Sequence, residues 1–173
     1  MRVWGRLRPA QWAASIYQID FGRLWRLGYR FILTDLDNTL AEWNAPAPPQ
    51  LAAWLAELRG RGFAVCIVSN NGRERVSAFA GPLGLPAVWK AGKPRRRAYR
   101  EALKQIGGQA SQTVMIGDQV FTDILGGNRL GMHTVLVRPL HAREALRTRV
   151  LRLAERAVMR GMAPGEPGEE DGR

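Results

Sequence analysis

Two aspartates separated by a single residue stand directly behind a short apolar segment. The segment covers residues 31–34, and the two acids are Asp35 and Asp37. Apolar segments of this length are typical of buried parallel strands, and open α/β sheets bind their ligands beyond the carboxyl ends of such strands. We therefore expect both carboxylates to lie where a fold of this kind carries out its chemistry.

Further polar groups follow three later apolar segments. In chain order they are Ser69 with Asn70, Lys93, and Asp118 with Asp123. Carboxylates are hard oxygen ligands for Mg²⁺, which usually completes its coordination with oxygen atoms of a phosphorylated substrate. A lysine supplies a compact positive charge for another phosphate oxygen. These residue types, meeting at one edge of a sheet, predict a divalent-metal site that holds a phosphate group.

The elements that must position these residues alternate along the chain. Strands are predicted at residues 31–34, 63–68, 87–89, 113–116 and 134–137. Helices are predicted at residues 50–59, 72–79, 94–106, 121–130 and 142–159. Strands separated by helices form right-handed βαβ units. The pattern therefore predicts an α/β fold, with a five-stranded parallel sheet and helices on both of its faces.

Four motifs in this order closely resemble those of the haloacid dehalogenase (HAD) superfamily of phosphatases. The matches are Asp35-Leu36-Asp37-Asn38-Thr39, Ser69, Lys93, and Gly117-Asp118 with Asp123. Segments 15–17, 36–44, 65–71 and 116–128 also resemble one branch, the YqeG-type subfamily of HAD class IIIA, which is related to mitochondrial phosphatidylglycerophosphate phosphatases. The resemblance implies a three-layer Rossmann-like fold, and we place this phosphatase domain at residues 30–160, with a basic helix at its end.

The resemblance implies a catalytic role for three residues. Asp35 would attack phosphorus as the nucleophile and form an aspartyl-phosphate. Asp37 would protonate the leaving oxygen and then activate the water that hydrolyses the intermediate. This requires Asp37 to arrive protonated, a state that neighbouring carboxylates favour. Lys93 would hold the nucleophile and the phosphate in line and balance charge in the transition state.

The same resemblance implies the residues that hold the metal and the substrate. The Mg²⁺ ligands would be Asp35, Asp37 through its backbone carbonyl, Asp118 and Asp123. Asp123 would act through a water molecule or by orienting Lys93. The phosphoryl oxygens would be bound by Ser69, Asn70 and Thr39.

The spacing of the motifs leaves no room for a cap domain over the site. Only about thirty residues separate Asp37 from Ser69, and only 23 separate Ser69 from Lys93, while each interval already contains a helix and a strand. An open site does not easily enclose a small metabolite. It suits a phosphate on something large, such as a lipid headgroup, a protein or the end of a nucleic acid. Together with the basic flanks of the chain, the family resemblance implies phosphatidylglycerophosphate in a bilayer as the substrate. A soluble, protein or nucleic-acid phosphate stays open, as does a ribosome- or RNA-associated scaffold, although the complete catalytic set argues against a scaffold.

The charge of the chain predicts an anionic partner. The net charge is +11, and most of it lies in two flanks: residues 1–30 hold six Arg and one Asp, and residues 138–160 hold seven Arg and two Glu. Membrane surfaces, nucleic acid and the ribosome would all attract such charge. Trp and Leu interleaved with Arg favour the membrane. The basic arm at residues 1–29 either packs on the domain or lies on a bilayer.

The remaining features concern the compartment and the end of the chain. No apolar stretch is long enough for a transmembrane helix, and no signal peptide is recognised. Cys66 is the only cysteine, and we expect it to be a small core residue in a reducing cytoplasm. The protein would then act peripherally at the inner face of the membrane. The Gly-, Pro- and acid-rich tail at residues 161–173 is expected to be disordered.

Overall fold

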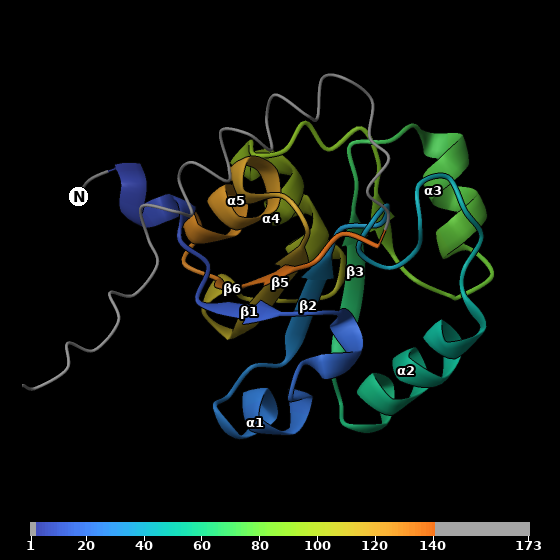
Figure 1. The fold of residues 1–173 in the computed structure, drawn as a ribbon, viewed down its shortest axis with the longest axis horizontal. Helices are drawn as coiled ribbons and strands as arrows, with labels where there is room; N and C mark the ends of the chain where they lie inside the picture. The colour runs from blue at the N-terminus through green and yellow to red at the C-terminus, as the bar shows by residue number, and fades with distance from the viewer. Residues whose placement is uncertain (1–2, 141–173) are drawn as a thin grey trace, which may run out of the picture. The chain divides into compact units, whose positions relative to one another are not determined.

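A six-stranded parallel sheet forms the centre of the protein (Figure 1). The computed structural model describes residues 3–140. The strands are β1 (Gln11–Ala13), β2 (Phe31–Thr34), β3 (Ala64–Val68), β4 (Ala87–Val88), β5 (Thr113–Gly117) and β6 (His133–Val137), in the spatial order β1-β6-β5-β2-β3-β4. Because every pair is parallel, the carboxyl ends of all six strands reach the same edge.

Helices cover both faces of this sheet, as predicted. They are α1 (Phe21–Arg26), α2 (Pro49–Gly60), α3 (Arg73–Ala80), α4 (Arg96–Gln105) and α5 (Leu125–Asn128), with short helical turns η1 (Val3–Leu7), η2 (Ile16–Gln18), η3 (Ala110–Gln112) and η4 (Val120–Ile124). Neighbouring strand residues such as Ile32 and Leu33 pack into separate core clusters, because successive side chains point to opposite faces. Figure 1 shows α4 and α5 on one side and α1 and α2 on the other.

The predicted strand count was wrong by one, because the N-terminal arm supplies β1. This strand pairs with β6 and places Trp12 opposite Leu136. It has only three residues and is half-exposed, so it produces no apolar segment in the sequence. The described part of the arm packs on the domain, since Ile16, Phe21 and Leu24 belong to the same buried cluster as α2. Burial in this cluster favours the first of the two alternatives for the arm.

The helix predicted at residues 121–130 is replaced by two short elements. η4 is a turn of π-helix, and α5 adds a single α-helical turn. A pair of glycines explains how closely this segment packs: a Cβ on Gly126 would overlap the Tyr99 hydroxyl, and one on Gly127 would lie 2.7 Å from Thr134 Cγ2. The two glycines therefore serve close packing against α4 and the sheet.

We expect Gly126→Ala to lower the free energy of unfolding by about 1–3 kcal/mol, because the added methyl overpacks the contact with Tyr99. Gly60→Ala is the matched control, since nothing lies within 4 Å of its added Cβ. Urea unfolding of both variants measures the difference. Equal stability of Gly126→Ala and the unaltered protein would show that the Tyr99 ring moves aside without cost.

Cys66 is fully buried in the cluster below α4, as predicted. Burial raises the pKa of its thiol to about 12, and the charge of Glu101 adds to this shift. Within residues 3–140, no helix has both the length and the apolar character needed to cross a bilayer. The predicted basic helix at residues 142–159 and the predicted disordered tail at residues 161–173 lie outside the described residues.

Candidate active site

Three aspartates from two neighbouring strand ends form a buried carboxylate cluster. Asp35 directly follows β2, Asp118 directly follows β5, and Asp123 lies in η4. Each offers one carboxylate oxygen, and these oxygens all lie within 4.8 Å of one another. The cluster is therefore a candidate metal site built from three of the four expected ligand residues, and its all-oxygen donor set suits a hard divalent cation.

Lys93 binds two members of this carboxylate cluster. Its Nζ donates to Asp35 Oδ1 at 2.6 Å and to Asp123 Oδ1 at 2.7 Å, and its side chain is almost fully buried. Burial by itself lowers the pKa of Lys93, but the charges of Asp123 and Asp35 outweigh burial and hold the pKa well above its ordinary value. One lysine charge beside three carboxylates leaves room for two further positive charges, which matches a divalent ion.

The surroundings of Asp35 raise the pKa of its carboxyl group. Burial raises its pKa to about 6, the charge of Lys93 opposes this shift, and Asp123 adds to it. In the metal-free protein, Asp35 therefore loses its proton near pH 6 rather than near pH 4. A buried carboxylate that ionises there, with one oxygen held by a lysine, is suited to act as a nucleophile.

A glycine allows Asp123 to reach the cluster. A Cβ on Gly117 would overlap Asp123 Oδ2, so the carboxylate packs directly against the end of β5. The backbone N–H of Gln119 donates to the same oxygen at 3.2 Å and holds it there. The Gly-Asp pair of the fourth motif thus has a steric reason, since any other residue at position 117 displaces Asp123.

The carboxylate of Asp37 is not a member of the cluster. It accepts hydrogen bonds from the Asn44 backbone N–H at 3.0 Å, from Arg75 Nη2 at 2.8 Å, and from Asn71 Nδ2. The expectation that neighbouring carboxylates surround Asp37 is therefore wrong: its partners are two neutral donors and one cation. Asp37 therefore remains a candidate metal ligand only through its backbone carbonyl, as the resemblance implies.

A tight turn separates Asp37 from the helix that follows. Asn38 has a φ of 65°, in the left-handed region that asparagine tolerates, and its N–H bonds the carbonyl of Ala41 at 2.7 Å. The turn brings Asn44 back to Asp37, whose carboxylate accepts its N–H. The loop is short and covers little, in keeping with the predicted absence of a cap.

The three predicted phosphate-binding residues occupy different surroundings. Ser69 is buried at the end of β3 and accepts the Asn71 N–H at 3.2 Å. Asn70 is exposed, and its Oδ1 accepts the Lys93 backbone N–H at 2.8 Å, which fixes the segment that carries the lysine. Thr39 is buried, and none of the described residues hydrogen-bonds its hydroxyl. Their contacts with phosphate stay predictions.

Two side chains at this site were not predicted from the sequence. Asn71 was included only within the segment 65–71 of the subfamily resemblance, and Arg75, in the first turn of α3, belongs to no motif. Their common signal is position: both follow β3 and lie at its carboxyl end, where the next turn of chain faces the same edge. A charged residue in that turn could have been singled out on this ground.

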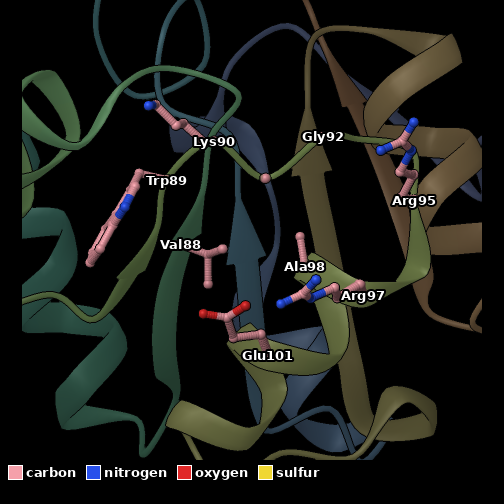
Figure 2. Close-up of a pocket in the computed structure, with 9 residues that line it drawn as sticks. Val88, Trp89, Lys90, Gly92, Arg95, Arg97, Ala98 and Glu101 are labelled. Atoms are coloured by element: carbon pink, nitrogen blue, oxygen red, sulfur yellow. The ribbon is translucent and has the colours of Figure 1, made fainter.

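A pocket of about 340 Å³ lies beside the segment that carries Lys93 (Figure 2). It is formed by β4, the following loop and the first turns of α4. Its lining includes Trp89, Lys90, Arg95, Arg97 and Glu101. The three basic side chains are solvent-exposed. This exposure is compatible both with attraction of an anionic substrate to the pocket and with an ordinary charged surface in contact with water.

Comparisons with known proteins extend the match beyond the motifs. The family model described as HAD-hydrolase-like matches residues 90–152. The probable phosphatase YqeG of Bacillus subtilis (strain 168) is 41% identical over 152 residues, which cover 87% of this chain and 88% of that protein. Phosphatidylglycerophosphate phosphatase 1 of Chlamydomonas reinhardtii is 33% identical over 140 residues. These residues cover 74% of this chain and 51% of that protein, so the chain spans about half of that relative.

Solved structures show the same fold at low sequence identity. A protein from Listeria monocytogenes serotype 4b has a TM-score of 0.55 and 17% identity, covering 67% of this chain and 84% of its own. The cobalt-bound deoxy-D-mannose-octulosonate 8-phosphate phosphatase of Haemophilus influenzae has a TM-score of 0.52 and 15% identity, covering 77% and 88%. The long, near-complete match to the Bacillus protein carries more weight. It shows that this chain belongs to the YqeG-type family of HAD-like phosphatases.

Proposed function

We propose that the protein is a Mg²⁺-dependent phosphomonoesterase in which Asp35 forms an aspartyl-phosphate. The observation that carries this proposal is the buried cluster of Asp35, Asp118 and Asp123 with Lys93 bound to two of its members. When bound by the three aspartates and the Asp37 backbone carbonyl, Mg²⁺ supplies the positive charge that offsets repulsion between the carboxylates and a phosphate dianion.

The residues divide the reaction into two displacements. In the first, a carboxylate oxygen of Asp35 forms a bond to phosphorus while the bond from phosphorus to the alcohol oxygen breaks. Asp37, which this step requires in its protonated form, gives its proton to that oxygen. In the second, Asp37 takes a proton from water, whose oxygen attacks phosphorus and releases inorganic phosphate and the Asp35 carboxylate. Lys93 fixes one oxygen of Asp35, which leaves the other for attack.

Three observations support a phospholipid, phosphatidylglycerophosphate, as the substrate. The relative from Chlamydomonas and one from Arabidopsis thaliana, 31% identical over 159 residues, are phosphatidylglycerophosphate phosphatases. The site has no cap. Large apolar side chains are also exposed on loops at its edge: Trp43, Trp89 and Leu140 have exposed fractions of 62%, 41% and 42%. These loops follow β2, β4 and β6, and tryptophan is favoured at membrane interfaces.

A substrate panel tests this proposal. Phosphate release is measured with Mg²⁺ and with EDTA on phosphatidylglycerophosphate in liposomes, on soluble monoesters and on RNA with a terminal phosphate. We expect Mg²⁺-dependent release that is fastest from the liposomes. Preference for a soluble, protein or nucleic-acid phosphate would reject the lipid, and inactivity on every substrate would favour the scaffold that the net charge of +11 also permits.

We expect the double variant Trp43→Ala, Trp89→Ala to bind anionic liposomes at least about tenfold more weakly, because each indole contributes apolar area at the interface. Trp12→Ala is the matched control: its side chain is 56% exposed but lies on the edge strand β1. Liposome flotation measures binding. Weakening by Trp12→Ala alone would instead assign membrane contact to the N-terminal arm.

A further inference from the structure

Arg75 keeps one buried donor unused beside the active site. Its Nη2 lies 2.8 Å from Asp37 Oδ1, and its side chain is only 19% exposed. Its Nε is buried, and no acceptor among the described residues hydrogen-bonds it. A buried guanidinium N–H without an acceptor is costly, so such groups in folded proteins usually face a water molecule or a ligand.

The guanidinium is held in place by contacts on other sides. The Phe79 ring, one helical turn later on α3, lies 5.3 Å from the guanidinium carbon. Asn71 binds the second oxygen of Asp37, so the acceptor of Arg75 is itself fixed. Nε and Nη2 can together grip two oxygens, the side-on geometry in which arginine binds carboxylate or phosphate. In this site Nη2 donates to Asp37, whereas Nε has no acceptor among the described residues.

We propose that Arg75 Nε binds a second anionic group of the substrate, a phosphate diester one glycerol unit away from the phosphate that is removed. This inference rests on the proposed function, in which Asp37 serves the leaving oxygen. Because Arg75 touches Asp37, its unused donor lies beside the group that serves that oxygen, and we place the second phosphate of the substrate there. A simple phosphate monoester offers nothing there, whereas a diester oxygen completes the grip. Arg75 thereby selects substrates that carry a second phosphate.

Two water-soluble substrates isolate this contact from membrane binding. Glycerol 3-phosphate carries the leaving alcohol alone, and glycerophosphoglycerol phosphate carries the same alcohol joined to a diester. We expect Arg75→Ala to lower kcat/KM on the diester-bearing substrate about 10- to 100-fold more than on glycerol 3-phosphate, mainly through KM. Arg75→Lys keeps the positive charge but loses the paired N–H donors of the guanidinium. We expect it to retain part of the preference for the diester-bearing substrate over glycerol 3-phosphate.

Arg73→Ala is the matched control, because Arg73 begins the same helix, is exposed, and directs its guanidinium towards the Trp89 ring rather than towards Asp37. It should leave the ratio of the two kcat/KM values unchanged. An equal loss on both substrates in Arg75→Ala would overturn the proposal, since Arg75 would then act only by positioning Asp37. An unchanged ratio with unchanged rates would overturn it as well.

A binding measurement tests this inference separately from the proposed function. In the Asp35→Asn background, calorimetry measures Kd for glycerophosphoglycerol phosphate and for glycerol 3-phosphate, with and without Arg75→Ala. Tighter binding of the diester that depends on Arg75 supports the inference even if the enzyme hydrolyses neither compound. Equal affinities for the two compounds, in a protein that does hydrolyse phosphatidylglycerophosphate, would reject the inference alone.

Discussion

Asp35→Asn abolishes phosphate release while the protein stays folded. The expected fall in kcat is on the order of 10⁴- to 10⁶-fold, the size of loss found when a covalent nucleophile is removed. Asparagine has the same shape and still accepts the hydrogen bond of Lys93, but its amide does not form the acyl-phosphate. Phosphate release with Mg²⁺ measures the loss, and ³²P transfer to the protein at low pH measures the intermediate directly.

The stability of Asp35→Asn shows whether its loss of activity comes from the missing nucleophile or from unfolding. The folded protein holds the proton of Asp35 up to a pKa of about 6, above the ordinary value of 3.8. Ionisation of Asp35 therefore lowers the stability of the metal-free protein as the pH rises from about 4 to about 6. The amide that Asp35→Asn introduces does not ionise, so we expect the metal-free variant to gain stability relative to the unaltered protein across this interval.

Urea unfolding in EDTA at pH 4 and pH 7 measures this difference. A variant that is clearly less stable than the unaltered protein at pH 7 would contradict the argument, and its inactivity would then say nothing about the nucleophile. A stable variant that retains more than about one thousandth of the activity would exclude Asp35 as the nucleophile.

The sequence was sufficient to predict those parts of the fold that repeat a simple pattern. The five predicted strands, β2 to β6, are short apolar segments, and four of them are followed by a polar motif. Their existence and parallel arrangement therefore followed from the alternation of strands and helices. β1 could not be found in this way: its three residues pair only at one edge, and Trp12 points to solvent. η4 could not be found either: residues 121–130 have the pattern of one helix, whereas the structure divides them into a π-helical turn and a short α-helix.

The residues of the candidate site that belong to a motif could be predicted from the sequence. The hydrogen-bond partners of those residues could not, because they come from other segments. The meeting of Asp35, Asp118 and Asp123 followed from parallel strand ends. The surroundings of Asp37 did not, because its partners Asn44, Asn71 and Arg75 come from three different segments. Arg75 is one of 23 arginines in the chain, so its type alone gave no reason to select it.

Lys93→Met should destabilise the metal-free protein by about 3–5 kcal/mol, because it leaves buried carboxylates without their cation. Lys93 is the side chain that binds both Asp35 and Asp123, and methionine fills similar space without charge. Lys104→Met, on the exposed face of α4, is the matched control and should change stability by less than about 0.5 kcal/mol. Urea unfolding in EDTA measures both variants.

The pH and metal dependence of this loss identify its cause. Without Lys93 the carboxylates bind protons more readily in the folded state, so the deficit should shrink as the pH falls from about 8 to about 5. Mg²⁺ should also restore stability, since a bound divalent ion replaces the missing positive charge. A deficit that is the same at every pH and in Mg²⁺ would mean that Lys93 contributes packing rather than charge, and that the three carboxylates do not form a metal site.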